Sequence, residues 1–181
     1  MNVRTLCLAI LNIQDATGYE IKKLSTDGEF QHFVEVSYGS IYPALSKLEE
    51  DCMVSSHIAT QDGKPNRKIY SITPEGRLEF INLINVLPKP DKYKSEFLLL
   101  SLNADIASRA LLEQAIDGQL NQFASEMEML DNLLTDCDQP ALIWTANYGR
   151  RVMEAKIKYL KENKGRLLEL APEHPNAKAA E

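Results

Sequence analysis

Positive charge gathers in one short stretch of the sequence, residues 64–68, beside a loop dense in turn-forming residues. Four of its side chains can donate hydrogen bonds to phosphate oxygens: Lys64, Asn66, Arg67 and Lys68. Strand-like runs flank the loop, so the pattern predicts a β-hairpin with cations at its tip. Such charge can serve only to keep a hairpin soluble. Directly after a DNA-recognition helix, the same hairpin would be a wing that lays cations on backbone phosphates or in the minor groove.

A second stretch, residues 37–50, has the composition of a helix that enters a DNA groove. Ile41, Leu45 and Leu48 recur at helical spacing and form an apolar stripe. The first turn carries hydroxyls, aromatic rings and bare backbone, namely Ser37 as the expected N-cap, then Tyr38, Gly39, Ser40 and Tyr42. Free N–H groups and the positive dipole end of such a helix favour phosphate. The alternative is an ordinary amphipathic helix of a small bundle.

Two further side chains are candidates for phosphate contacts on helix surfaces. Tyr19 stands at the start of a helix expected from residue 18, and Lys47 lies on the outer face of the predicted recognition helix. Core packing is the alternative for Tyr19, and a solvated surface is the alternative for Lys47.

Nothing in the sequence groups the residues that catalysis or a metal site requires. His32, His57 and His174 are isolated, and no nucleophile–base pair, glycine-rich phosphate loop or metal-ligand spacing is present. Three widely spaced cysteines, odd in number, indicate free thiols in a reducing compartment: Cys7, Cys52 and Cys137. We therefore expect no enzyme, no metal and no cofactor. Without a signal peptide or an apolar run long enough for a bilayer, we also expect a cytoplasmic protein without membrane contact.

The overall charge does not by itself indicate a nucleic-acid partner. The chain has 181 residues, 44% of them hydrophobic, and a formal net charge of −6. Any DNA contact must therefore come from a local basic patch. This acidity leaves open a second hypothesis, a winged-helix protein-interaction module without specific DNA binding.

The elements needed to position these residues follow from the periodicity of the chain. Short helices are expected over residues 3–13 and 18–25, the second capped by Thr17, and together with the recognition helix they make a helix-turn-helix core. After the hairpin, Thr73 and Pro74 begin another helix. Pro88 and Pro90 then mark a boundary. We predict a winged helix-turn-helix domain over residues 1–87.

The second part of the chain is expected to be helical. A short helix over 95–102 precedes two long ones, about 104–134 and 141–170, joined as an antiparallel hairpin. Such a hairpin is too thin to bury both apolar stripes, so a second copy of the chain is the expected partner and a fold-back against residues 95–102 is the alternative. The predicted dimer interface consists of Leu112, Ile116, Leu120, Phe123, Met127, Leu130, Val152 and Tyr159. We assign residues 88–172 to this dimerisation domain and 173–181 to a flexible tail.

Charged and aromatic residues of the long helices permit two further predictions. Basic residues of the last helix usually form a solvated face; the alternative is that they pair with acidic residues of the preceding helix, which would help to specify the antiparallel arrangement. Phe97, Trp144 and Tyr148 are the candidate lining of an effector cavity between the winged helix and the long helices. Aromatic residues at helical spacing can instead belong to a core or a dimer seam.

Three separated motifs of residues 3–80 resemble the PadR family of transcriptional regulators. They are Gly18-Tyr19-Glu20-Ile21, Gly39-Ser40-Ile41-Tyr42-Pro43-Ala44-Leu45, and Arg67-Lys68-Ile69-Tyr70-Ser71-Ile72-Thr73-Pro74-Glu75-Gly76-Arg77. The wing sequence also resembles the virulence-gene activator branch of that family. Cys52 departs from the family pattern, which usually has glycine at this position.

The resemblance implies a mostly α fold with an α+β wing, and a homodimer that binds double-stranded DNA. In such proteins each winged helix reads one half of a pseudo-palindromic promoter site, and the C-terminal helices form the dimer. The two recognition helices then lie about one DNA turn apart, on the order of 34 Å. Many members are repressors released by a small aromatic or hydrophobic effector, whereas the activator branch has no established need for one. The sequence does not decide between repression and activation, and it names neither operator nor effector.

Overall fold

The computed structural model describes residues 1–37, 39–61, 64–135 and 137–172, with the backbone alone for residues 61, 64 and 65. The predicted tail 173–181 lies outside the described residues. The chain forms two compact units, Met1–Asp91 and Lys92–Glu181.

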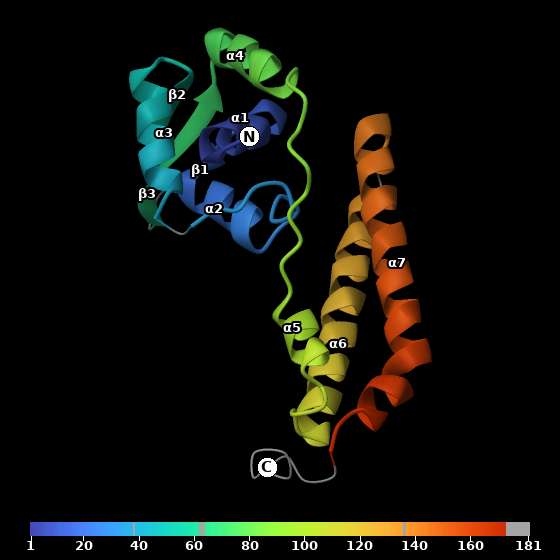
Figure 1. Ribbon diagram of the computed structural model, residues 1–181. Coiled ribbons are helices and arrows are strands. Elements are labelled where there is room, and N and C mark those ends of the chain that lie inside the picture. Colours follow the sequence, from blue (N-terminus) through green and yellow to red (C-terminus); the bar gives the residue numbers. More distant parts are fainter. Residues whose placement is uncertain (38, 62–63, 136, 173–181) are drawn as a thin grey trace. The chain divides into compact units, whose positions relative to one another are not determined.

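The first unit is a winged helix-turn-helix, as the sequence predicts (Figure 1). Its helices are α1 (Val3–Ile13), α2 (Gly18–Thr26), α3 (Ile41–Glu50) and α4 (Pro74–Ile84). Its strands are β1 (Ala16–Thr17), β2 (Val54–Gln61) and β3 (Lys64–Ile72). They form one antiparallel sheet in the order β1-β3-β2. The sequence predicts the β2–β3 hairpin but not β1, because two residues are too few to show an alternating pattern.

Apolar stripes of the first three helices make the core of this unit. The side chains that are almost completely buried come mainly from α1, α2 and α3, and include Leu8, Ile10, Leu11, Ile21, Ile41, Leu45 and Leu48. Full burial of one such side chain contributes about 1.5–3 kcal/mol relative to exposure. The apolar stripe therefore anchors α3 in the core and leaves the opposite face of this helix in solvent.

The starts of α2 and α4 are capped as predicted. Thr17 accepts from the Glu20 N–H at 3.2 Å, and the Glu20 carboxylate accepts from the Thr17 N–H at 2.8 Å, which is a capping box. Thr73 accepts from the Gly76 N–H at 3.0 Å, and Pro74 opens α4. Each cap satisfies N–H groups that lack a partner inside the helix.

The start of α3 differs from the prediction, which has Ser37 as the N-cap. Ser40 is the N-cap residue, and its N–H and hydroxyl both donate to the Ser37 carbonyl oxygen, at 3.0 and 2.7 Å. Ser40 already has backbone angles of the right-handed helical region, φ −92° and ψ −19°, and α3 begins at Ile41. Tyr42 and Pro43 consequently fall in the first helical turn.

The end of α3 is a turn that normally requires glycine. The Met53 N–H donates to the Leu48 carbonyl at 2.8 Å and the Cys52 N–H to the Glu49 carbonyl at 3.0 Å, which together form a Schellman motif. Cys52 occupies the left-handed position with a φ of 59°. The chain thus keeps the turn that a glycine would form, but with a strained backbone conformation at a residue that carries a Cβ.

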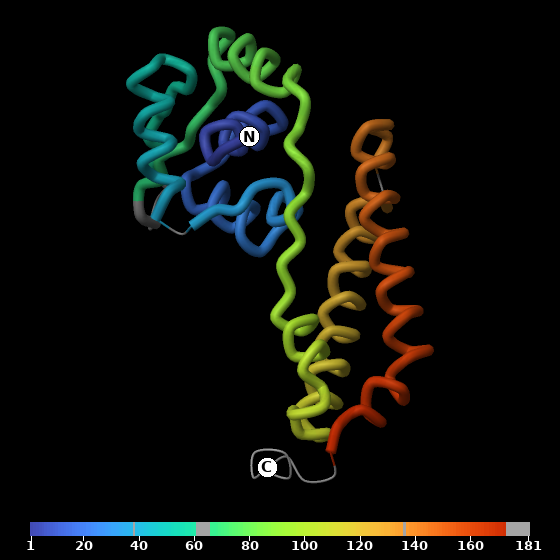
Figure 2. The backbone as a smooth tube through the Cα atoms, viewed as in Figure 1, coloured from blue at the N-terminus to red at the C-terminus, as the bar shows by residue number. Residues whose placement is uncertain are grey.

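The second unit contains α5 (Glu96–Leu102), α6 (Arg109–Leu134) and α7 (Pro140–Glu169). The last two run side by side as an antiparallel hairpin, shown by the tube in Figure 2. The predicted start of α6 near residue 104 is wrong by about one turn. Ser108 caps the helix by accepting from the Leu111 N–H at 3.2 Å, and turns from Asn103 fill the preceding residues.

Two kinds of contact join the hairpin helices. Leu112 and Ile116 of α6 are fully buried in a cluster with Leu168 of α7. Lys164 lies 2.7 Å from an Asp117 carboxylate oxygen and 3.5 Å from one of Glu113, and Arg150 lies 3.1 Å from one of Asp131. These ion pairs confirm the alternative considered for the basic residues of α7, in which they pair with acidic residues of α6.

Replacement of Cys52 by glycine is expected to raise the free energy of unfolding by about 1 kcal/mol. A left-handed residue with a Cβ costs about 1–2 kcal/mol, and glycine returns part of this gain as entropy of the unfolded chain. Urea unfolding of Cys52→Gly measures the effect. Cys52→Ala retains the Cβ and should not be stabilised; an equal gain in this control would show that the thiol, and not the backbone, causes the strain.

Gly76→Ala should destabilise the protein by at least about 2 kcal/mol, the range of a forced steric overlap. Gly76 is buried, and an added Cβ would overlap the Met53 carbonyl oxygen. The control is Gly118→Ala in α6, where no atom lies within 4 Å of the added Cβ. That variant should gain about 0.5–1 kcal/mol from helix propensity. Thermal unfolding of both variants tests the pair, and equal midpoints would refute the steric argument.

Candidate nucleic-acid interface

The N-terminal turn of α3 presents an open surface. A Cβ added at Gly39 would meet nothing within 4 Å, and the Tyr42 side chain is 50% exposed. Ser37 is exposed and Ser40 half-buried, whereas Tyr38 lies outside the described residues. The first turn holds no acidic residue, and Ser40 forms no side-chain cap. The N–H groups at the start of α3 and the positive end of the α3 dipole are therefore available to an anion.

The start of α2 lies next to this turn. A Cβ at Gly18 would come within 2.7 Å of Tyr42 Cε1, so the tyrosine ring of α3 packs against the first residue of α2. The next side chain, Tyr19, is 66% exposed. Core packing, the alternative considered for Tyr19, is therefore wrong. Two exposed tyrosines stand at neighbouring helix starts.

The wing adds positive charge to the same neighbourhood. Asn66 and Arg67 are exposed on β3, with Arg67 opposite Ala59 of β2. Hydrogen bonds from Thr17 chiefly hold the pKa of Glu20 below its ordinary value, and the charge of Arg67 lowers it further. Thr17, the N-cap of α2, pairs with Ile69 of β3, so Arg67 stands two residues from that pair on the same strand. The side chain of Lys64 lies outside the described residues.

Lys68 has a different environment from that predicted for a wing contact. Its Nζ lies 2.7 Å from Oε2 of Glu49 on α3 and 5.0 Å from the centre of the Tyr70 ring. The other carboxylate oxygen of Glu49 accepts from the Ser56 hydroxyl. The Lys68 ammonium, followed by Ser56, lowers the pKa of Glu49, and Glu49 in turn raises the pKa of Lys68. The Lys68 ammonium therefore forms an ion pair with a carboxylate of α3.

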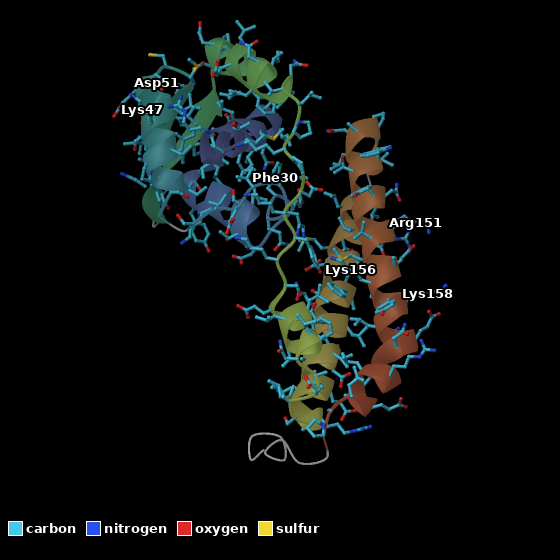
Figure 3. The ribbon with its side chains drawn as sticks, in the orientation of Figure 1. Phe30, Lys47, Asp51, Arg151, Lys156 and Lys158 are labelled. Atoms are coloured by element: carbon cyan, nitrogen blue, oxygen red, sulfur yellow. The ribbon has the colours of Figure 1, made fainter. Side chains whose placement is uncertain are left out.

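Lys47 is likewise engaged by carboxylates at the end of α3 (Figure 3). Its Nζ lies 3.3 Å from a Glu50 oxygen and 3.1 Å from one of Asp51, while Asp51 also lies 2.8 Å from Arg4 of α1. Asp51 and then Glu50 raise the pKa of Lys47. Arg4, followed by Lys47, lowers the pKa of Asp51. Lys47 remains exposed, but a phosphate would have to compete with two carboxylates for it.

Sequence reasoning missed Glu49 and Ser56, the two residues that hold Lys68. The acidic run at the end of the recognition helix was a signal, because carboxylates there are unfavourable next to the negative dipole end unless cations compensate them. Strand alternation also places Ser56 and Lys68 on one face of the hairpin.

The three residues predicted to line an effector cavity do not come together within one chain. Phe97 packs with the cluster around Leu112 and Leu168, near the C-terminal end of α7. Trp144 and Tyr148 stack near the other end, with ring centres 5.9 Å apart. Residues 144 and 168 are separated by roughly 36 Å along the helix. Only Trp144 and Tyr148 form a common aromatic surface.

The residues predicted for the dimer interface divide into three groups by burial. Leu112, Ile116 and Phe123 are buried inside the single chain, so the apolar stripe of α6 mainly closes the hairpin itself. Those of intermediate burial are Leu120, Met127, Leu130 and Val152. Tyr159 is 67% exposed, like Trp144 (70%) and Tyr148 (61%) on the same helix.

Two kinds of site are not found in the described part of the chain. No group of three or more His, Cys, Asp or Glu side chains could hold a metal ion there. Its helices also include none with the length and apolar character needed to cross a bilayer. The three cysteines are free, and burial raises the pKa of the Cys7 thiol to about 12.

A helix-turn-helix core, a recognition helix with an open start and a wing on the adjacent sheet define a winged-helix DNA-binding protein. Residues 7–82 match the model of the transcriptional regulator PadR-like family. The winged-helix unit belongs to this family of transcriptional regulators.

Relatives with the same architecture cover most of the chain. The structure of smu.1604c from Streptococcus mutans is 28% identical, with a TM-score of 0.80, over 91% of this chain and 99% of that one. The PadR-like transcriptional regulator BC1756 from Bacillus cereus is 26% identical, with a TM-score of 0.75, over 92% and 94% of the two chains.

A third relative is the negative transcriptional regulator PadR of Bacillus subtilis. It is 27% identical over 124 residues, 68% of each protein. This Bacillus subtilis protein has been crystallised in complex with operator DNA and in complex with p-coumaric acid. Over 91% of this chain and 98% of that one, the operator complex has a TM-score of 0.69 at 21% identity, which is a likeness of fold. The virulence-gene activator branch stays a prediction.

The pair of Glu49 and Lys68 should make stability depend on acid pH. Because the folded-state pKa of Glu49 is held below its ordinary value of 4.5, the stabilisation is present above that value and is lost as the pH falls through the lowered pKa. Urea unfolding at a series of pH values should show Glu49→Gln less stable than the wild type at about pH 7, by a difference that shrinks as the pH falls below 4.5. In a Lys68→Met background the pH-dependent part of the difference should shrink. A difference that stays constant over the whole range would contradict the pairing.

Proposed function

We propose that the protein is a regulator that binds a pseudo-palindromic promoter site as a homodimer, with α3 in the major groove and the wing over the backbone. The observation that carries this proposal is the meeting of three elements at the start of α2. Tyr42 of α3 packs against Gly18, and Arg67 of the wing stands on β3 two residues from Ile69, which pairs with Thr17, the N-cap of α2. Two helix starts and a cation on one surface suit the phosphates on either side of a groove.

The proposed DNA contacts fall into three groups according to the element that carries them. The start of α2 contributes Tyr19, and the wing contributes Lys64, Asn66 and Arg67. The start of α3 contributes Ser37, Tyr38, Gly39, Ser40 and Tyr42. Lys47 belongs at the edge of this surface, since its exposed ammonium is shared with two carboxylates.

The relatives support two parts of this proposal, the binding of DNA and the control by a small-molecule effector. The Bacillus subtilis PadR, crystallised with operator DNA and with p-coumaric acid, has the same fold. We extend this to a small aromatic or hydrophobic effector for the present protein. The relatives are bacterial, and promoter DNA in bacteria lies in the cytoplasm, which supports a cytoplasmic location.

The homodimer is supported by the outer face of α7. Trp144, Tyr148 and Tyr159 are each more than half exposed on this helix. A large exposed aromatic surface on a soluble protein marks an interaction site. A two-fold axis at this face would pair two winged helices and match a palindromic site with half-sites about 34 Å apart.

Arg67→Ala should weaken binding to the protein's own upstream region and lower the salt dependence. Loss of one phosphate contact is expected to reduce the slope of log affinity against log salt by about 0.9. Fluorescence anisotropy at several salt concentrations measures this slope for the full chain.

The matched control is Arg151→Ala on α7. That arginine is exposed and lies near a Glu154 oxygen at 2.8 Å, so its removal should leave the slope unchanged. Wild-type binding no tighter to the upstream fragment than to random DNA would contradict the proposal. It would favour the winged-helix interaction module, for which the carboxylates on Lys47 and Lys68 are the supporting observation.

A further inference from the structure

We propose that Glu49 is a positioning residue that fixes the β2–β3 wing against the recognition helix, and that Lys68 serves this clamp instead of contacting phosphate. The proposal rests on the proposed function in that the wing and α3 act together on DNA. It assigns Lys68 a different role from that of its neighbour Arg67.

The clamp joins three elements through one carboxylate. Oε2 of Glu49, in the last turn of α3, accepts from Lys68 Nζ of β3 at 2.7 Å. Oε1 of the same side chain accepts from the hydroxyl of Ser56 on β2. Both strands of the hairpin are therefore tied to the recognition helix, in addition to the turn that connects α3 to β2.

The strand register explains why these partners face α3. Ser56 pairs with Tyr70 and Ile58 pairs with Lys68, so Ser56, Tyr70 and Lys68 share one face of the hairpin. Tyr70 is 6% exposed and belongs to the core. The Lys68 ammonium lies between its ring and the Glu49 carboxylate.

Arg67 projects from the opposite face of β3, because consecutive residues of a strand alternate. Arg67 is exposed, and its charge contributes to lowering the pKa of Glu20 on α2. Arg67 can therefore neutralise phosphate while Lys68 holds the hairpin in place. Exposed ion pairs add little to global stability, so the clamp acts mainly on the position of the wing.

The salt dependence of DNA binding separates a clamp from a phosphate contact. Lys68→Met should weaken binding to the upstream fragment by up to about five-fold, the limit for an exposed ion pair, with an unchanged log–log salt slope. Arg67→Ala should lower that slope by about 0.9. The exchanged pair Glu49→Lys with Lys68→Glu should recover most of the affinity that Lys68→Glu alone loses. Circular dichroism confirms that each variant is folded.

A second measurement does not require DNA. Amide hydrogen exchange of the free protein should be faster in β2 and β3 of Glu49→Gln and Lys68→Met than in the wild type, with the core of α1 unchanged. Ser56→Ala, which removes one arm of the clamp, should give a smaller change in the same direction.

Either of two results would overturn the clamp. One is a salt slope lowered by Lys68→Met as much as by Arg67→Ala, which would make Lys68 a phosphate contact. The other is unchanged amide exchange in the wing of both clamp variants. If the wild type fails to bind its upstream region while exchange in the wing still responds to these variants, the proposed function fails and the clamp stands.

Discussion

The turn that ends the recognition helix is the constraint on which the wing depends. Cys52 takes a left-handed conformation, and the Met53 carbonyl oxygen then accepts from the Thr73 N–H at 3.1 Å and from its hydroxyl at 3.0 Å. Since β2 begins just after Met53 and β3 ends just before Thr73, these bonds close the base of the hairpin. Gly76 leaves the space that the same carbonyl occupies. The Met53 carbonyl thus connects the end of α3, both strands and the start of α4.

The charges of α3 are distributed unequally along the helix. Its first turn has no acidic residue, whereas Glu49, Glu50 and the C-cap Asp51 stand at its end. Carboxylates at a helix C-terminus are unfavourable with the dipole, and here they are compensated by Arg4, Lys47 and Lys68. The positive, N-terminal end of α3 therefore carries no carboxylate, and the carboxylates at its negative, C-terminal end are paired with cations of the same chain. This explains how a protein of net charge −6 can present a surface suited to DNA.

The sequence predicts those features of the fold that are decided by neighbours in the chain. The caps Thr17 and Thr73 act on residues three positions away, and both could be assigned from their sequence pattern. The same rule failed at Ser37, because the Ser37 carbonyl accepts from Ser40 and α3 begins after Ser40 without a side-chain cap. Lys68 pairs with Glu49 nineteen residues earlier, and no local pattern carries such a contact. The candidate site was therefore found as a region, while the division of labour between Arg67 and Lys68 required the structure.

The hairpin of α6 and α7 limits how a second copy can bind. Leu112 and Ile116 already lose their solvent contact inside one chain, so a partner gains no further burial from them. Trp144, Tyr148 and Tyr159 still expose most of their surface. At 3.6 residues per turn, these three positions fall within about 60° of one side of α7. In the proposed dimer a two-fold axis at this side would bring the aromatic row of one copy against that of the other. The hydrophobic gain of dimerisation would then come from α7, while the buried apolar residues of α6 hold the hairpin together.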